Sequence, residues 1–242
     1  MLRPVTCRAP ESSEPGLAAA RSRNLWHNRV VSFGLAVSAV CVIALLVAEL
    51  RGSRLGVWLF KPLASLGFVA TALTSGALDT TYGRTVVSGL CLCALGDVLL
   101  IPAANGAAFV LGMAAFMLGH AAYSGAFCAR VVESWPAFVA FAAMSILAAW
   151  VLGWIGARLA RPMRWAVGAY MVVISVMVGC AVAASLDTGD ARIAVGALAF
   201  ALSDLSVARE RFVQPGFANL LWGLPLYYAA QSVLALSVAA HP

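Results

Sequence analysis

The chain has 242 residues, of which 62% are hydrophobic and only 11% are charged, and its mean hydropathy is +0.92. This apolar share exceeds that of ordinary soluble domains, so the composition excludes a soluble protein and predicts an all-α, polytopic membrane helix bundle. The formal charge of +6 is explained by basic loops facing anionic lipid, and we expect no nucleic-acid partner.

The first 29 residues contain three prolines, five arginines and two glutamates, and they lack the apolar core of a signal peptide. We predict a disordered basic tail at 1–29 and a single membrane-embedded helical-bundle domain at 30–242. A membrane-spanning helix needs about 20 mostly apolar residues. Eight such segments follow the tail, at 30–50, 56–74, 83–101, 107–130, 136–157, 163–185, 190–208 and 216–240. Their short connections predict antiparallel neighbours in one bundle.

Two carboxyl groups stand out because they lie inside predicted spans. Asp97 is in the segment CALGDVLLI and Asp204 in FALSDLSVA, whereas the other eight Asp and Glu residues fall in the tail, in loops or at helix ends. An ionised Asp at a helix centre costs about 2.5–3.5 kcal/mol on insertion scales. Function is the default explanation for such residues. The alternative is a polar group that reaches interfacial water or glues two helices together.

The positions of polar residues along the spans predict their depth. Both acids lie four residues before the estimated ends of the third and seventh spans, which run in the same direction, so we expect them on one membrane side at similar depth. Lys61 and Arg209 belong to that side too, either binding phosphate or serving as ordinary interfacial residues. His120 and Tyr227 each follow an acid by 23 residues and are expected about 17–20 Å down their helices, below the acids.

A weak internal repeat accompanies this spacing. The pattern Ala-Leu-small-Asp occurs at Ala94–Asp97 and again at Ala201–Asp204. Together with the shared 23-residue spacing, it suggests that 30–130 and 136–240 are two four-helix halves of a parallel repeat.

Further polar side chains lie at membrane depth. His120 and Tyr123 share one helix face, as do Tyr227 and Gln231, and we expect all four to point into the bundle. A single intramembrane histidine makes a multi-histidine zinc site improbable. The six cysteines include no CxxC pair. The five within predicted spans are interpreted as small apolar packing residues: Cys41, Cys91, Cys93, Cys128 and Cys180.

Several of these motifs resemble a known family. The segments GDVLLI, FVLGMAAFMLGHAAY, GALAFALSDLSVARERF and PLYYAAQ are similar to the YhhN-type lysoplasmalogenases, eight-helix membrane proteins, and FKPL and AYMVVISVMV extend the similarity to about residues 30–240. The resemblance implies hydrolysis of the vinyl ether bond of lysoplasmalogens to a fatty aldehyde and a glycerophospho-alcohol. The family's pattern falls on Lys61, Asp97, His120, Tyr123, Tyr170, Ser203, Asp204, Tyr228 or Tyr227, and Gln231. The charged Glu210 and Arg211 depart from it.

A pair of carboxyl groups suits this chemistry. Protonating the β-carbon of a vinyl ether generates an oxocarbenium ion, which water captures as a hemiacetal that collapses to aldehyde and alcohol. One protonated acid can give the proton, while one anion stabilises the cation and takes a proton from water. The sequence leaves the roles open; we begin with Asp97 as the acid, Asp204 as the base and His120 in support. No metal or organic cofactor is required.

We expect a lysophospholipid substrate to enter sideways from one leaflet. Its phosphate would lie near Lys61 and Arg209 and its chain would run past Tyr123 and Tyr227. A proton- or solute-coupled transporter is the competing hypothesis, because it would also place Asp, His and Tyr inside a two-half bundle. Against transport, both acids lie near one face. A third hypothesis, a non-catalytic lipid-binding or scaffold protein, predicts that replacing the acids leaves function intact.

The loop charges predict an orientation. Loops on the acids' side carry seven arginines and the opposite loops three, which predicts an active site towards the cytoplasm, in a bacterial inner membrane. Counting the five arginines of the tail reverses the comparison, eight to seven. We give more weight to the short loops.

Overall fold

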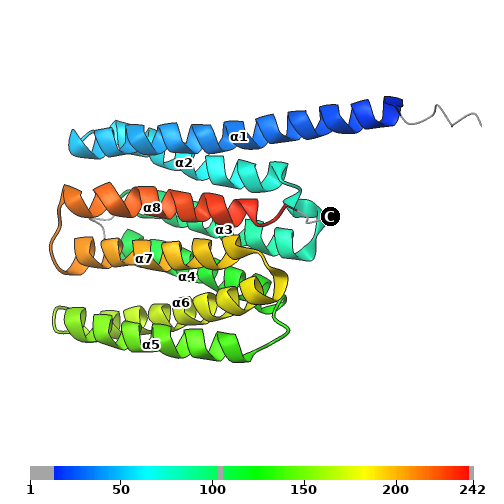
Figure 1. Ribbon diagram of the computed structural model, residues 1–242. Helices are drawn as coiled ribbons and strands as arrows, with labels where there is room; N and C mark the ends of the chain where they lie inside the picture. Colours follow the sequence, from blue (N-terminus) through cyan, green and yellow to red (C-terminus); the bar gives the residue numbers. More distant parts are fainter. Residues whose placement is uncertain (1–13, 103–105, 240–242) are drawn as a thin grey trace, which may run out of the picture.

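Long helices make up the computed structural model, which describes residues 14–102 and 106–239 (Figure 1). In chain order these are α1 (Glu14–Leu50), α2 (Arg54–Thr74), the 3-10 turn η1 (Ala77–Asp79), α3 (Thr81–Leu99), α4 (Gly106–Cys128), α5 (Trp135–Gly156), α6 (Arg161–Thr188), α7 (Ala191–Phe212) and α8 (Phe217–Leu236). The described residues contain no strand. The predicted all-α bundle is confirmed.

Local sequence signals set several helix ends. The hydroxyl oxygens of Ser53 and Thr80 accept the backbone N–H groups of Gly56 at 3.2 Å and Gly83 at 2.9 Å, at the starts of α2 and α3. Such caps satisfy amides that the first helical turn leaves free. At the other end of a helix, Gly189 closes α6 with a φ of 72°, a left-handed conformation that glycine adopts readily.

Seven helices of the described chain are long and apolar enough to cross a membrane: α1 through its segment Val31–Leu50, and all of α2 to α7. The remaining long helix, α8, is less apolar because it carries buried polar side chains. It nevertheless packs along α7 and contacts α1, α2 and α3 within the bundle (Figure 1). The protein is therefore a polytopic membrane bundle in which α8 supplies polar groups to the interior.

The helices are arranged as four hairpins. The pairs α3–α4 and α7–α8 occupy the centre, α1–α2 covers one flank and α5–α6 covers the other (Figure 1). Helix α2 packs on α3 and α8, while α6 packs on α7 and α4. Exchanging α2 with α6, α3 with α7 and α4 with α8 therefore reproduces these contacts, whereas the contacts of α8 with α1 and α3 have no comparable counterpart at α4. This is the arrangement expected of two four-helix halves.

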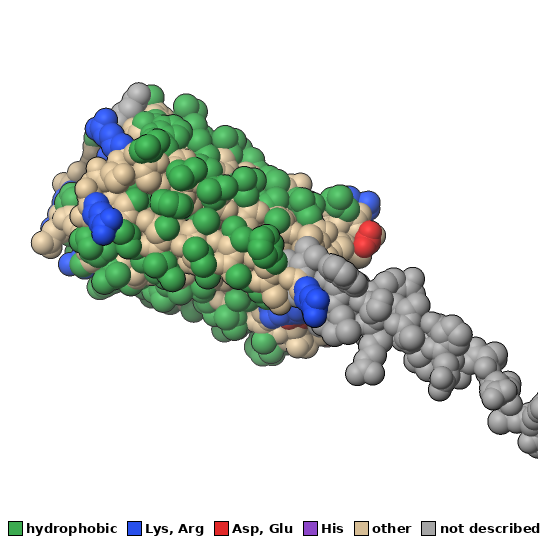
Figure 2. All heavy atoms as spheres, turned by 90° about the horizontal axis from the view of Figure 1, so that it is seen from above, with side chains coloured by type: hydrophobic (Ala, Val, Ile, Leu, Met, Phe, Trp, Pro, Cys, Tyr) green, Lys and Arg blue, Asp and Glu red, His purple; other side chains and the backbone are tan. Residues whose placement is uncertain are grey.

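The outer surface is apolar between two charged ends. Figure 2 shows hydrophobic side chains over the middle of one face and Lys and Arg side chains at its ends. On the flank formed by α5, Phe138 is 70% exposed and Ile146 74% exposed. Large apolar side chains exposed around a whole bundle match a hydrocarbon environment rather than water.

Helix α1 begins at Glu14, well before the predicted first span, and extends past the rest of the bundle (Figure 1). Residues 1–13 of the predicted basic tail lie outside the described residues. The division into a tail and one bundle domain therefore stays a prediction.

Candidate active site

Asp97 lies near the end of α3 and is only 2% exposed. Its Oδ2 accepts hydrogen bonds from the Ser65 hydroxyl at 2.7 Å and the Tyr227 hydroxyl at 2.8 Å. The Lys61 Nζ lies 3.8 Å from Oδ1. A buried carboxylate needs hydrogen-bond donors and a nearby cation, because it has acceptors only. Asp97 has both, so its surroundings suit the ionised form.

The adjacent tyrosines of α8 have different functions. Tyr227 donates directly to Asp97. The Tyr228 hydroxyl donates to the backbone oxygen of Lys61 at 3.2 Å and lies 3.5 Å from the Ser65 hydroxyl. Tyr228 thus holds the turn of α2 that presents Lys61 and Ser65.

Asp204 lies within α7 and has a different set of partners. The Tyr170 hydroxyl of α6 donates to its Oδ2 at 3.0 Å, and His120 Nε2 of α4 lies 3.5 Å from the same oxygen. No lysine or arginine of the described chain forms an ion pair with it. The Asp204 side chain is 17% exposed, and this exposed part faces the cavity described below.

The hydrogen bond of His120 bears on the protonation of this second pair. Its Nδ1 lies 2.7 Å from the Phe116 carbonyl oxygen, which only accepts, so Nδ1 carries a proton. In a neutral imidazole Nε2 is then bare, and it has no hydrogen-bond partner among the described residues. A bare nitrogen facing a carboxylate oxygen would be repulsive. A proton held between Asp204 and His120 would remove this repulsion, so the surroundings of Asp204 suit the protonated form.

The two acids occupy equivalent places in the two halves, and their partners are exchanged. Asp97 is bonded to Tyr227, which lies 23 residues after Asp204, while Asp204 contacts His120, which lies 23 residues after Asp97. Helix α2 completes the first site and α6 the second. The residues that follow the acids by 23 positions thus form contacts between the two halves, not within one half.

The expected depths of His120 and Tyr227 were wrong, since both contact the acids instead of lying below them. Cα–Cβ bonds tilt towards the start of a helix. The acids on α3 and α7 therefore lean into the bundle, whereas side chains on the antiparallel α4 and α8 lean back towards them. In addition, α7 continues to Phe212, so Asp204 lies eight residues before its end instead of four.

One cavity of about 690 Å³ joins the two acids. Of the predicted site residues, Lys61, Asp97, Tyr170, Ser203, Asp204 and Tyr227 line it. Its other walls are mostly apolar side chains of α4 to α8, including Met113, Met144, Val151, Met171, Ile174 and Leu202. A polar end with two carboxyl groups and an apolar remainder form a site for an amphipathic molecule.

Tyr123 and Gln231 do not line the cavity. The buried Tyr123 hydroxyl donates to Gln231 Oε1 at 2.8 Å, which joins α4 to α8. Ser203 donates to the Phe200 backbone oxygen at 2.7 Å, within its own helix. Arg209 is exposed and does not line the cavity.

The sequence interpretation missed Ser65 and Glu49. Ser65 gave no signal beyond being a small polar residue four positions after Lys61. Glu49 lines the cavity together with Glu210 and Arg211, and it interacts electrostatically with Lys61 and Glu210. As an acid in the last turn of the first predicted span, it could have been recognised. No cluster of three or more His, Cys, Asp or Glu side chains suited to a metal ion occurs in the described ranges.

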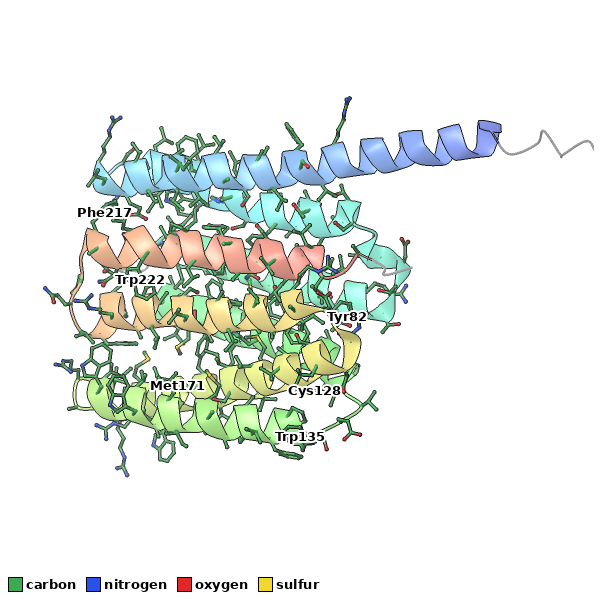
Figure 3. The ribbon with its side chains drawn as sticks, in the orientation of Figure 1. Tyr82, Cys128, Trp135, Met171, Phe217 and Trp222 are labelled. Carbon is green, nitrogen blue, oxygen red and sulfur yellow. A yellow bond between two sulfur atoms is a disulfide. The ribbon has the colours of Figure 1, made fainter. Side chains whose placement is uncertain are left out.

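A disulfide joins Cys128 at the end of α4 to Cys180 in α6, with their Cα atoms 5.0 Å apart. The interpretation of these two cysteines as packing residues was wrong. They lie 52 positions apart on different helices, so their proximity depends on the packing of α4 against α6. Figure 3 shows Cys128 near the bundle end that carries Tyr82 and Trp135, opposite the end where α8 begins at Phe217.

The fold and the site define a polytopic membrane protein with two intramembrane carboxyl groups on one cavity. The YhhN family model matches residues 56–238, and the chain belongs to this family. A lysoplasmalogenase of Mycobacterium bovis and one of Mycobacterium tuberculosis are each 33% identical over 175 residues, which is 69% of this chain. The chain covers 65% of the length of these two relatives.

The match to a mammalian relative covers a larger share of this chain and of the relative. Lysoplasmalogenase TMEM86A of Bos taurus is 30% identical over 186 residues, which is 74% of this chain and 72% of the relative. No solved structure matches the chain significantly.

Proposed function

We propose that the protein is a lysoplasmalogenase-type hydrolase that cleaves the vinyl ether bond of alkenyl lysophospholipids. The observation that carries this proposal is that two carboxyl groups with opposite surroundings line one amphipathic cavity. Family membership and relatives named lysoplasmalogenase support it. Water and the lipid are the reactants, and the products are a fatty aldehyde and a glycerophospho-alcohol.

Asp204 is the proton donor in this proposal, and Asp97 is the anion. This reverses our starting assignment, because the cation lies beside Asp97 whereas the contact with His120 favours a protonated Asp204. The reaction needs one acid that is protonated before turnover and one that is ionised. Tyr170 and His120 orient the Asp204 carboxyl group.

The steps follow from these roles. Asp204 transfers its proton to the β-carbon of the vinyl ether, and the resulting oxocarbenium ion is stabilised by the Asp97 carboxylate. Water adds to the carbon next to the ether oxygen as Asp97 takes one of its protons. The hemiacetal then loses its hydroxyl proton to Asp204 and collapses to the aldehyde. The glycerol oxygen leaves with the proton held by Asp97, so both acids are restored.

The charged side chains at the cavity mouth suit the substrate's headgroup. Lys61 and Arg211 line the cavity, and basic side chains of this kind bind phosphate. We propose Arg211 in the place that the sequence interpretation gave to Arg209. The phosphate would thus lie at the acid end of the bundle, where α3 and α7 finish.

Aldehyde release tests the proposal. Purified protein in detergent or nanodiscs, supplied with an alkenyl lysophospholipid, should form one aldehyde per vinyl ether lost. The matched diacyl-derived lysolipid, which has an ester instead, should remain intact. If wild-type protein forms no aldehyde from any alkenyl lysolipid, the hydrolase is rejected.

Transport is the second candidate, because two halves with similar helix packing are also found in carriers. A carrier would move a lipid or small solute across liposomes and show flux that depends on a proton gradient. Flux without aldehyde formation would establish this alternative.

For the membrane orientation, we propose that the acid end faces the cytoplasm, in a bacterial inner membrane, because its short loops and the adjoining helix ends carry seven arginines against three at the other end. Helix α8 starts at that end, so the C-terminus would lie on the opposite side. A C-terminal alkaline phosphatase fusion should be active and a GFP fusion dark. The reverse pattern would overturn the orientation.

A further inference from the structure

A second hollow of about 160 Å³ lies between α5 and α6. It shares Ala148, Met171 and Ser175 with the large cavity, so the two spaces have a common wall. Figure 3 shows Met171 in the half of the bundle nearer the acid end. The hollow is therefore at about the level of Asp204, because Tyr170, the residue before Met171, donates to that acid, and it lies on the α5–α6 side of the cavity.

The outer rim of this hollow reaches the surface of the bundle. Its rim residue Val172 is 56% exposed, and Ala149 is exposed as well. Ser175, on the inner side, is 1% exposed, and its hydroxyl donates a hydrogen bond to the Met171 backbone oxygen at 2.8 Å. The hollow thus runs from the cavity wall to the lipid-facing surface and offers little polarity on the way.

The hollow lies at a depth in the membrane that corresponds to the hydrocarbon core of the bilayer. Its α6 residues, from Gly168 to Ser175, lie 7 to 14 positions after the start of α6 at Arg161, or about 10–21 Å along the helix. The bilayer's hydrocarbon core is about 30 Å thick. A chain that passes between α5 and α6 at this level would leave the cavity among acyl chains and not among headgroups.

We infer that the seam between α5 and α6, lined by Ser145, Ala148, Ala149, Leu152, Gly168, Met171, Val172 and Ser175, is where the long hydrocarbon chain of the substrate passes between the cavity and the bilayer. The inference rests on the proposed function for the identity of the chain. It replaces the expected path past Tyr123, which is buried in the core behind the wall.

Gly168 is the position that controls the width of the seam. An added Cβ there would meet only Leu152 Cδ2, at 3.8 Å, which is an ordinary contact. A large side chain can therefore occupy the hollow without displacing the backbone of either helix. Gly153 on α5 provides a matched control, because an added Cβ there meets nothing within 4 Å and Gly153 lines neither space.

The first test compares Gly168→Phe with Gly153→Phe on two alkenyl lysolipids, one with a long chain and one with a chain short enough to remain inside the large cavity. Gly168→Phe should lower kcat/KM for the long chain by about tenfold or more, since loss of a chain-binding pocket costs this much. It should leave the short chain unaffected. Gly153→Phe should change neither value. Equal effects of Gly168→Phe on both chains, or no effect, would overturn the inference.

The second test does not depend on turnover. A lysolipid with a photoreactive group part-way along its chain should label peptides from 145–152 or 168–175 in Asp204→Asn protein, and Gly168→Phe should remove this labelling. Labelling of α4 near Tyr123 instead would overturn the inference. If wild-type protein forms no aldehyde while the seam is still labelled, only the proposed reaction fails.

Discussion

The Asp97 and Asp204 sites occupy the same place in the two halves, yet their surroundings differ in charge. Asp97 has a lysine 3.8 Å away and two hydroxyl donors, whereas Asp204 has one tyrosine and an imidazole and no cation. One architecture used twice thus gives one acid surroundings that suit an anion and the other surroundings that suit a protonated carboxyl group. Acid–base catalysis needs both states at once.

The largest expected effect comes from removing the proton donor. Asp204→Asn should reduce aldehyde formation about a thousandfold, within the range for loss of general acid catalysis. With its amide nitrogen in the place of Oδ2, the variant side chain can donate one hydrogen to His120 Nε2 and the other to the Tyr170 hydroxyl oxygen, which can also accept, so thermal stability should be retained. Asp79→Asn, an exposed acid in η1, is the control. Wild-type activity, or a large loss of stability, in Asp204→Asn would contradict the assignment.

Asp97→Asn should abolish activity to a similar degree but should also destabilise the fold. It leaves Lys61 without its carboxylate, and breaking a buried ion pair typically costs about 3–5 kcal/mol, less here because Lys61 is partly exposed. Lys61→Met combined with Asp97→Asn should recover stability without activity. Thermal unfolding in detergent measures both effects. If the double variant is less stable than Asp97→Asn alone, Asp97 is not held as an anion.

His120→Phe gives a smaller effect. The ring can keep its contact with Phe200, whose centroid lies 4.3 Å from that of His120, but the nitrogen facing Asp204 is lost. We expect kcat to fall about ten- to a hundredfold, since orientation of the acid is only part of its contribution. Phe200→Leu, which alters packing and keeps the nitrogen, is the comparison. An equal loss of kcat in both variants would assign His120 to packing alone.

The smallest effects should come from the two tyrosines. Tyr227→Phe and Tyr170→Phe each remove one hydrogen bond to an acid, worth about 0.5–1.5 kcal/mol or up to about 3 when the partner is charged. Tyr227→Phe should therefore lower kcat/KM more than Tyr170→Phe. The reverse order would indicate that Asp204 carries the charge.

Helix positions were predictable because apolar runs and their polar breaks determine where a chain can cross a bilayer. The end of α7 was not predictable from this pattern, since the charged residues Arg209, Glu210 and Arg211 resemble a loop. They belong to the last turn of the helix, where cations are favourable. The acids, Lys61 and the tyrosines were found as polar exceptions in apolar segments. Which of these residues contact one another could not be predicted, because a depth calculated from the rise per residue does not include the direction in which each side chain points. The exchange of Tyr227 and His120 between halves required the packed structure.

The link between Cys128 and Cys180 has a consequence for where the products go. Such crosslinks persist in oxidising compartments and are rare in reducing ones. The link therefore favours the proposed orientation, in which this end of the bundle lies outside the cytosol and the acid end faces the reducing side. Any aldehyde formed there would be delivered to the inner leaflet, within reach of cytosolic dehydrogenases or reductases that consume such electrophiles.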